Sequence, residues 1–313
     1  MDPLTTINIK KDSSFAMMLA AQRSGWELHV MYQADLYTKN ESPRAFSRTI
    51  EVMDDTNRWY ETVSEQDIDL CSLDAILMRK DPPFDIEYIT STYILELAEN
   101  SGTLIVNSPS SLRNNNEKMF ITQFPQCCTP FLVSRAKHRL REFVSERYAA
   151  AQQDVILKPL DGMGGASIYR VNPDDPNLSV ILETVSEHET RTVMAQQFIP
   201  EITAGDKRVL LIDGEAVPYA LARIPASGET RGNLAAGGSG VGVELSARDH
   251  WICQQVSPVL KQQSILFAGI DIIGDYLTEI NITSPTCIRE LDAIYSLDIA
   301  GDLMRCIEQH LAA

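Results

Sequence analysis

Apolar and polar residues alternate along two neighbouring stretches near the end of the chain, which predicts a pair of β-strands. The first covers residues 267–276 and ends in the turn signal Gly274-Asp275, and the second covers residues 277–286. Residues two positions apart on a strand share a face, so Glu279 and Asn281 project together while apolar neighbours pack on the other side. The pattern predicts a hairpin with a carboxylate and a carboxamide on one face.

Asp271 lies on the first of these strands, and its position depends on the length of the turn. A loop of only Gly274 and Asp275 would place Asp271 opposite Thr278, whereas a three-residue or bulged loop would place it opposite Glu279. In the second case Asp271, Glu279 and Asn281 offer the oxygen ligands that Mg²⁺ prefers beside phosphates. In the first case Asp271 is a turn or edge carboxylate with no ligand role. The hairpin alone leaves both interpretations open.

A second apolar run, residues 154–159, leads into a glycine-rich loop. Lys158 lies at the end of this predicted strand, and Gly162, Gly164 and Gly165 follow it. An ammonium group and backbone N–H groups without Cβ obstruction can approach phosphate oxygens. The spacing matches neither a Walker A motif nor a Rossmann fingerprint. It predicts a strand, loop and strand lid over phosphate, with an ordinary glycine hairpin as the alternative.

Three more strands are predicted at residues 192–200, 209–212 and 215–223, the last two joined by an Asp213-Gly214 turn. Arg208 and Arg223 fall near the same end of that hairpin. Paired guanidinium groups suit carboxylate or phosphoryl oxygens, although either arginine could be a solvated charge at a strand end.

Residues 224–242 contain six glycines, which excludes a stable helix or packed strand. Arg231 and Asn233 favour a functional lid over this part of the chain. The alternative is a plain flexible linker.

The first third of the chain has the order of strand, helix and strand that is typical of a parallel sheet. Strand-like residues 75–78 and 103–107 bracket a helical stretch at residues 87–100. We also expect a helix over residues 112–124, with a domain boundary after it and a weaker boundary at Pro200. This predicts an α/β protein whose units are residues 1–120, 121–200 and 201–313.

The composition limits the possible partners. The net charge of −16 and the pI near 4.7 argue against nucleic acid or an anionic membrane as a partner, because both would be repelled. The chain contains no apolar run long enough to span a membrane and Met1-Asp2-Pro3 does not resemble a signal peptide, so a cytoplasmic location is expected. The six cysteines have no metal-site spacing, and the five histidines are scattered.

Several of these motifs together resemble the bacterial glutathione synthetase family of ATP-grasp ligases. The glycine loop and the hairpin with Glu279 are found in ATP-grasp enzymes broadly, whereas the segments Arg-Lys-Asp-Pro-Pro and Arg-Gly-Asn-Leu-Ala are more specific to this family. The resemblance covers essentially the whole chain. The segments that carry it are residues 8–14, 78–85, 158–165, 231–238, 271–275 and 278–286.

The resemblance implies a parallel α/β N-terminal domain followed by a two-lobed, α+β ATP-grasp domain. It also implies a reaction in which ATP phosphorylates the carboxylate of γ-glutamylcysteine and the amine of glycine attacks the acyl phosphate, giving glutathione, ADP and phosphate. Mg²⁺ is the implied metal, with Mn²⁺ as a possible substitute, and a homotetramer is the implied assembly. The alternatives are a related carboxylate–amine ligase with another acceptor, or a non-catalytic ATP-binding regulatory module.

The resemblance also assigns roles to individual residues. Those implied to hold metal are Asp271, Glu279 and Asn281. Those implied to bind ATP are Lys118, Lys158, Gly162, Gly164, Gly165, Gln196, Gln197, Phe198, Ile199 and Asp206. Those implied to act on the transferring phosphoryl group, or to close the lid over it, are Arg208, Arg223 and Arg231. Those implied to bind the peptide substrate are Arg79, Asn281, Ser284, Pro285 and Thr286.

One departure from the family concerns the beginning of the sequence. Family members ordinarily carry a short apolar strand immediately before the segment that is Met1-Asp2-Pro3 here. We therefore expect the N-terminal domain of this sequence to be short by its first strand, which would leave apolar surface and unpaired backbone groups beside its neighbours.

Overall fold

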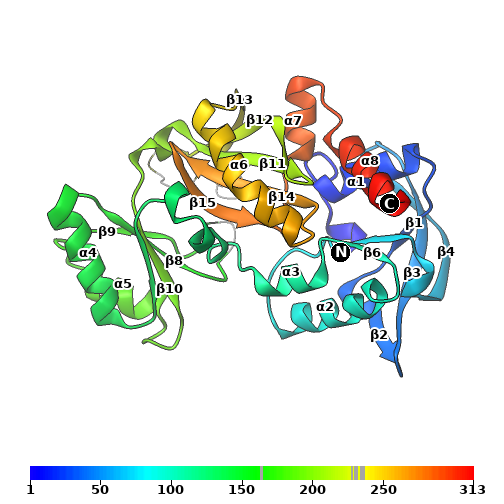
Figure 1. Cartoon of the computed structure of the whole chain (residues 1–313), viewed down its shortest axis with the longest axis horizontal. Helices are drawn as coiled ribbons and strands as arrows, with labels where there is room; N and C mark the ends of the chain where they lie inside the picture. The colour runs from blue at the N-terminus through cyan, green and yellow to red at the C-terminus, as the bar shows by residue number, and fades with distance from the viewer. Residues whose placement is uncertain (163–164, 227, 229–231, 233–236) are drawn as a thin grey trace.

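The computed structural model of the chain describes residues 1–313 except 163–164, 227, 229–231 and 233–236 (Figure 1). Within the described part, no helix has the length and apolar character that crossing a membrane requires. The molecule is elongated, with the N-terminal elements and the middle of the chain at opposite ends and the C-terminal sheet between them.

The first unit contains an antiparallel sheet, which corrects the expectation of a parallel one. Strand β3 pairs antiparallel with each of β1, β2 and β4. The physical reason is the long β3–β4 hairpin over residues 42–69, since strands joined by a short turn pair antiparallel. Only β5 and β6 pair in parallel, across the predicted crossover helix α2. These elements are α1 (Ser13–Arg23), β1 (Leu28–Val30), β2 (Leu36–Lys39), β3 (Ser42–Val52), β4 (Tyr60–Asp69), β5 (Ala75–Leu77), α2 (Ile86–Glu99) and β6 (Leu104–Val106).

The single helix expected over residues 112–124 does not form. Helix α3 (Pro109–Asn114) ends early, and the 3-10 helix η4 (Phe120–Gln123) follows a turn. The side chain of Asn116 explains the break, because its Oδ1 accepts hydrogen bonds from the backbone N–H groups of Lys118 and Met119 at 3.1 Å. Asparagine competes in this way with helical backbone hydrogen bonds.

The middle of the chain forms a four-stranded antiparallel sheet in the order β7-β10-β8-β9, covered by two helices. Leu140 of α4, Leu182 of α5 and Leu157 of β8 form part of its buried core. The predicted order of strand, glycine loop and strand is observed, since β8 and β9 pair antiparallel on either side of that loop. The elements are β7 (Phe131–Ser134), α4 (Lys137–Ala151), β8 (Val155–Pro159), β9 (Tyr169–Val171), α5 (Leu178–Val185) and β10 (Val193–Gln197).

The last part of the chain forms a five-stranded antiparallel sheet in the order β13-β12-β11-β14-β15. Strand β13 corrects the expectation that residues 224–242 exclude a strand, because Gly240 and Gly242 pair with Arg223 and Leu221 at the edge of this sheet. Helix α6 lies across one face of this sheet (Figure 1), and α8 packs against α1 of the first unit. The elements are β11 (Asp206–Ile212), β12 (Glu215–Ile224), β13 (Ser239–Glu244), α6 (Ala247–Gln262), β14 (Phe267–Ile273), β15 (Tyr276–Asn281), α7 (Ile288–Tyr295) and α8 (Ile299–Ala312).

Both hairpins predicted in this sheet are observed. Asp213 and Gly214 form the two-residue turn between β11 and β12, with positive φ angles of 44° and 73°, as a type I′ turn requires. In the β14–β15 hairpin Asp271 pairs with Glu279 and the next residue, Ile272, pairs with Leu277. Thr278 is therefore an extra, bulged residue. Of the two open alternatives, the bulged hairpin is the one that forms.

A cavity of about 550 Å³ lies in the first unit, between β1 and β5. Among the described strands, β1 pairs only with β3 and β5 pairs only with β6, and residues of both β1 and β5 line this cavity. Its walls are largely apolar and include Met17 and Met18 of α1 and Met304 of α8.

Candidate active site

A second cavity, of about 580 Å³, receives side chains from all three parts of the chain. Most of the site residues predicted from the sequence line it, which brings together motifs that lie far apart along the chain. Those that line it are Arg79, Lys118, Lys158, Gly162, Gly165, Gln196, Gln197, Phe198, Ile199, Asp206, Arg208, Arg223, Asp271, Glu279, Asn281, Ser284 and Thr286.

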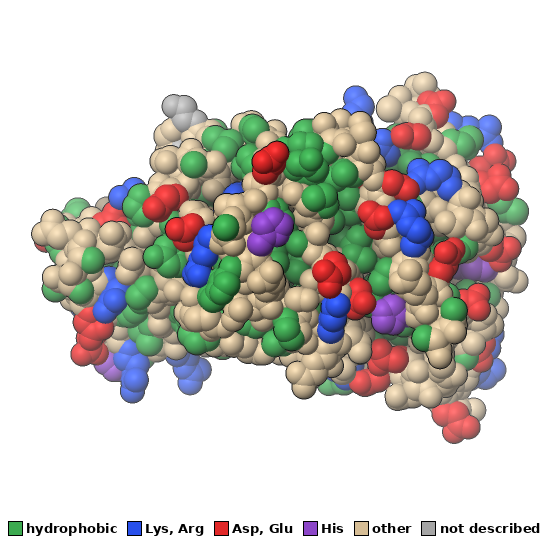
Figure 2. All heavy atoms as spheres, turned by 45° about the horizontal axis from the view of Figure 1, so that its top comes forward, with side chains coloured by type: hydrophobic (Ala, Val, Ile, Leu, Met, Phe, Trp, Pro, Cys, Tyr) green, Lys and Arg blue, Asp and Glu red, His purple; other side chains and the backbone are tan. Residues whose placement is uncertain are grey.

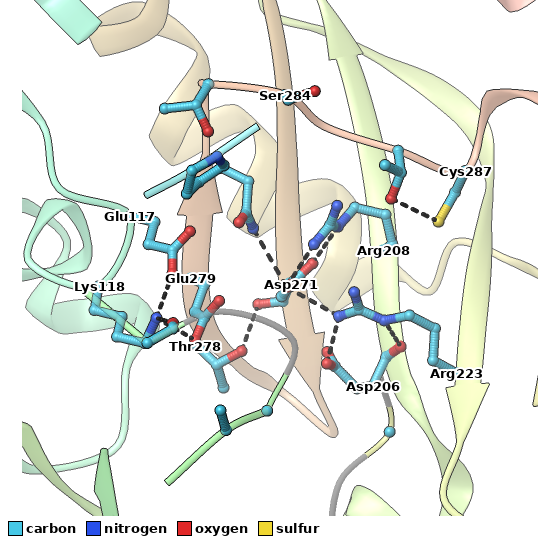
Figure 3. Close-up of a pocket in the computed structure, with 18 of the residues that line it drawn as sticks. Glu117, Lys118, Asp206, Arg208, Arg223, Asp271, Thr278, Glu279, Ser284 and Cys287 are labelled. Atoms are coloured by element: carbon cyan, nitrogen blue, oxygen red, sulfur yellow. Dashed lines mark hydrogen bonds and ion pairs between the residues drawn. The ribbon is translucent and has the colours of Figure 1, made fainter. Parts of the chain in front are cut away.

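Asp271 lies at the centre of the charged part of this cavity (Figure 3). Arg208 lies directly opposite it on β11 and binds both carboxylate oxygens, with Nη2 2.9 Å from Oδ2. Arg223 of β12 adds a third contact, at 2.9 Å. Burial alone would raise the pKa of Asp271, but the two guanidinium groups more than offset it and hold that pKa well below its usual range. Asp271 is therefore ionised at neutral pH.

Asp206 is the second carboxylate bound to Arg223. Burial raises the pKa of Asp206 to about 6, and although Arg223 opposes this, the charge of Asp271 adds to it. Within the described part of the chain, Oδ1 of Asp206 is buried without a hydrogen-bond partner. This oxygen is available to a polar group of a bound ligand.

Two lysines flank Glu279 on the other side of the cavity. Lys118 Nζ lies 3.5 Å and Lys158 Nζ 3.7 Å from Glu279 Oε1. Lys118 also donates to the carbonyl oxygen of Gly162 at 2.7 Å, which ties it to the start of the glycine loop. Burial lowers the pKa of Lys158 although Glu279 opposes this effect. Two buried ammonium groups beside a glycine loop suit the binding of phosphate oxygens.

The end of β10 and the turn after it form an uncharged wall of the cavity. Phe198 and Ile199 are buried there, and Gln196 lies on the preceding strand. Among the described residues, Nε2 of Gln196 is buried and has no acceptor. Apolar side chains with one free amide donor suit a flat heterocycle such as a purine.

Arg79 is a buried cation at the side formed by the first unit. Its Nε donates to Ser14 Oγ at 3.0 Å and its Nη2 donates to the carbonyl oxygen of Pro285 at 2.9 Å. Burial lowers the pKa of Arg79 to about 10. Its Nη1 is buried with no partner among the residues that the structure describes, so its N–H groups can donate to an anionic ligand atom.

Comparisons with known proteins agree with this geometry. The sequence model "Prokaryotic glutathione synthetase, ATP-grasp domain" matches residues 117–296, and "Prokaryotic glutathione synthetase, N-terminal domain" matches residues 1–113. The chain belongs to the prokaryotic glutathione synthetase family.

Curated members of the glutathione synthetase family match along nearly their entire length. The glutathione synthetase of Pseudomonas putida is 59% identical over 313 residues, which cover 100% of this chain and 97% of the relative. The glutathione synthetase of Escherichia coli is 58% identical over 311 residues, which cover 99% and 97%.

Solved structures of more distant proteins share the fold of this glutathione synthetase family member. An ATP-grasp ligase from Chryseobacterium gregarium, solved with ADP and a leader and core peptide, gives a TM-score of 0.63 at 13% identity and covers 97% of this chain and 95% of its own. The ATP-grasp ligase PsnB, solved with a precursor variant, Mg and ADP, gives 0.58 at 18% identity and covers 94% and 93%. At these identities the likeness concerns the ATP-grasp fold alone.

Three predicted residues of this glutathione synthetase family member stand apart from the rest. Gly164 and Arg231 lie outside the described residues, so the structure places neither. Pro285 does not line the cavity, and its carbonyl oxygen holds Arg79 instead. Residues 224–242 are described only in part, and of them Gly232 lines the cavity.

Sequence reasoning missed Glu117, a mostly buried carboxylate beside Lys118 and Glu279 (Figure 3). Burial and the charge of Glu279 raise the pKa of Glu117, although Lys118 opposes this. Its position next to Lys118 in the sequence was the one available signal. With Glu117 included, four carboxylates face four cations in the charged part of the cavity, namely Glu117, Asp206, Asp271, Glu279, Lys118, Lys158, Arg208 and Arg223.

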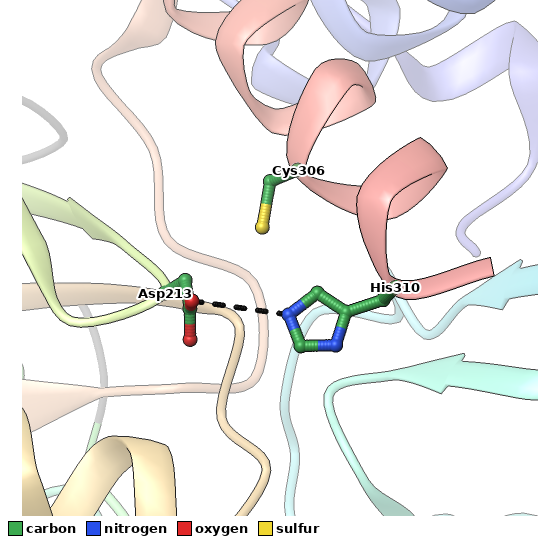
Figure 4. Close-up of side chains that lie close together, drawn as sticks. All are labelled: Asp213, Cys306 and His310. Atoms are coloured by element: carbon green, nitrogen blue, oxygen red, sulfur yellow. Dashed lines mark ion pairs between the residues drawn. The ribbon is translucent and has the colours of Figure 1, made fainter. Parts of the chain in front are cut away.

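The outer surface of the protein gives less indication of ligand binding than this cavity does. Figure 2 shows acidic and basic side chains interspersed on the face in view. Away from the cavity, Asp213, Cys306 and His310 lie with their ligand atoms within 4.8 Å of one another (Figure 4). Burial raises the pKa of the Cys306 thiol, which opposes the thiolate form that metals bind. Asp213 and His310 are 41% and 42% exposed, so we assign no metal to this cluster.

Proposed function

We propose that the protein joins γ-glutamylcysteine to glycine at the expense of ATP and releases glutathione, ADP and phosphate. The observation that carries the proposal is one cavity that combines a glycine loop, buried cations and a face of oxygen ligands, in a chain 59% identical to a glutathione synthetase over its full length. In this reaction the γ-phosphoryl group moves to the carboxylate of the dipeptide, and the amine of glycine then displaces phosphate from the acyl phosphate.

The oxygen atoms of Asp271, Glu279 and Asn281 fit a Mg²⁺ ion, with Mn²⁺ as a substitute. The fit rests on the donor set, because two carboxylates and an amide oxygen on paired strands face the same cavity. When bound, Mg²⁺ neutralises the phosphate oxygens and polarises the phosphoryl group under attack. Both oxygens of Asp271 contact arginine side chains, so Asp271 must release at least one guanidinium to become a ligand.

Lys118 and Lys158 would bind the phosphates of ATP together with the backbone of Gly162, Gly164 and Gly165. Their charges are buried and close to the glycine loop, which strengthens attraction to anionic oxygens. The adenine ring would lie against residues 196–199, with Gln196 donating to it. The unpartnered oxygen of Asp206 would accept from a ribose hydroxyl.

Arg208 and Arg223 would stabilise the charge that develops on the transferring phosphoryl group. Their guanidinium groups converge on Asp271 from adjacent strands, so a guanidinium released by Asp271 remains within the site. Arg79 would bind a carboxylate of the peptide substrate near Ser284 and Thr286. Residues 224–242, with Arg231, would close over the site and exclude water, which would otherwise hydrolyse the acyl phosphate.

A related ligase with a different acceptor is the second candidate function, since the ATP-grasp fold occurs in the D-alanyl-alanine synthetase A of Vibrio cholerae at 13% identity and a TM-score of 0.57. We propose further that the protein is a homotetramer and that its functional units divide near residues 120 and 200. Sedimentation equilibrium tests the tetramer, and limited proteolysis tests the divisions.

Coupled ADP release from the purified protein tests the function. The assay contains Mg²⁺-ATP, γ-glutamylcysteine and glycine, each omitted in turn, and the peptide product is identified by mass. We expect ADP and glutathione at equal rates only with all components present. ADP without glutathione would indicate another acceptor, and no ADP under any condition would contradict a ligase.

A further inference from the structure

The orientation of the Asn281 amide decides whether this side chain can bind a cation, because a carboxamide does so only through its oxygen. In one orientation Nδ2 lies 3.3 Å from Asp271 Oδ2 and 3.4 Å from the carbonyl oxygen of Gly269. The amide oxygen then faces a carboxylate oxygen of Glu117, and two acceptors oppose each other. In the exchanged orientation the two longer contacts to Gly269 and Asp271 are lost, and two shorter ones replace them: Nδ2 donates to Glu117 Oε2 at 3.1 Å, and Oδ1 accepts from Arg208 Nη2 at 3.2 Å.

The exchanged orientation is favoured by the chemistry of its two neighbours. A carboxylate can only accept hydrogen bonds and a guanidinium can only donate them. Glu117 and Arg208 therefore pair with the amide in one sense only, through two charge-assisted hydrogen bonds. This orientation places the amide oxygen on the side of Asp271, where a cation shared by the two residues would lie.

Glu117 is held in place independently of its side chain. The backbone N–H of Ile280, between Glu279 and Asn281, donates to the carbonyl oxygen of Glu117 at 3.0 Å. The turn around Asn116 fixes the same segment from the other side, through the side chain of Asn116 and the carbonyl oxygen of Leu160 at 2.9 Å. These backbone contacts thus hold the Glu117 carboxylate beside Asn281.

We propose that Glu117 is a positioning residue that turns the amide oxygen of Asn281 toward the cation. The inference rests on the proposed function, since it takes Asn281 as a ligand of the nucleotide-bound metal. Partners that orient metal ligands typically change metal affinity about 10- to 100-fold when they are removed.

A different role for Glu117 would be to balance the charge of Lys118, with which it also pairs. The two roles predict different losses. Charge balance alone would alter the affinity for ADP without metal and leave Mn²⁺ affinity unchanged. Orientation of Asn281 would weaken Mn²⁺ binding to the ADP complex.

The experiment measures free Mn²⁺ by electron paramagnetic resonance while the protein is titrated at saturating ADP. We expect E117L, which cannot accept a hydrogen bond from Asn281, to bind Mn²⁺ about 10-fold more weakly than the wild type. E117D, which keeps the charge but withdraws the carboxylate from Asn281, is expected to show the same loss. E183Q is the matched control, because Glu183 is a lysine-paired carboxylate on α5, away from the cavity, and should match the wild type.

Repeating the measurement in an N281D protein separates the orientation of the amide from the other effects of changing Glu117. A carboxylate at position 281 presents oxygen on both sides, so its orientation no longer matters. In N281D, the further change E117L is therefore expected to cause no additional loss of Mn²⁺ affinity. Wild-type affinity in both E117L and E117D, or an equal loss with and without N281D, would overturn the inference alone. Failure of the wild-type ADP complex to bind Mn²⁺ would overturn the proposed metal site as well.

Discussion

Asp271 on β14 lies directly opposite Glu279 on β15, and the bulge at Thr278 is what aligns them. Without the extra residue, Asp271 would pair with Thr278 and the two carboxylates would face opposite sides of the sheet. The bulge is held on both sides, since Thr278 Oγ1 donates to the carbonyl oxygen of Asp271 at 3.1 Å and Lys158 Nζ donates to that of Thr278 at 3.3 Å. One inserted residue therefore creates the proposed metal site.

Replacing Glu279 with glutamine is expected to leave the fold intact and to reduce turnover by about 100-fold or more, because the change removes the charge that holds the metal near the phosphates. The measurement is ADP release at saturating ATP over a wide range of Mg²⁺ concentrations, together with a thermal melt.

Glu61→Gln is the matched control for this change, because Glu61, on β4, forms an exposed ion pair with Arg58. It should behave as the wild type. A Glu279→Gln variant with normal turnover and a normal Mg²⁺ requirement would remove Glu279 from the metal site.

Within residues 224–242, Gly232 is the position at which a substitution should change the geometry of the cavity. A Cβ atom there would lie 2.5 Å from the carbonyl oxygen of Arg223 and 3.1 Å from Cβ of Asp206. Gly232→Ala must therefore displace backbone beside two proposed site residues. We expect kcat/KM for ATP to fall about 10-fold, since small misplacements of positioning groups are costly.

Gly240→Ala is the control that tests whether any methyl group added in this region would lower kcat/KM for ATP in the same way. The three atoms nearest to its Cβ would all belong to the flexible side chain of Leu221, at 3.2 Å or more. Steady-state kinetics of both variants should separate them. Equal kinetics for Gly232→Ala and the wild type would show that this contact does not matter for catalysis.

The sequence predicted the hairpins of the last sheet well, because alternation and the turns at Asp213-Gly214 and Gly274-Asp275 are local signals. The register of the last hairpin could not be predicted, because a bulge is one residue among several possible ones. The N-terminal sheet was misjudged for a different reason. Most of β4 is exposed, so it has little of the alternation of burial that marks a strand.

Glu117 shows the limit of local reasoning about a site. Its carboxylate meets Asn281 through a backbone hydrogen bond to Ile280, a residue far away in the sequence. The family resemblance was enough to predict a role for Lys118. The role proposed for Glu117, the residue before it, depends on a tertiary contact that the sequence does not reveal.

Asp292 gives a prediction about pH and stability that does not involve the active site. Burial raises the pKa of Asp292 to about 6, repulsion by Asp298 and Asp302 adds to this, and Arg23 opposes it. A carboxyl whose pKa is higher in the folded state than in the unfolded state, near 3.9, makes the protein less stable as the pH rises from about 4 to about 6. Above that range the full cost is present.

Asp292→Asn should remove this cost, because asparagine can still accept the hydrogen bond from the N–H of Ile299 at 3.1 Å. We expect a gain on the order of 1 kcal/mol at pH 7.5, reduced by solvent screening of this half-buried group, and none below pH 4. Urea unfolding from pH 4 to 7.5 measures it, with the exposed Asp174→Asn as the control. A gain that does not vary with pH would exclude the titration of Asp292 as its cause.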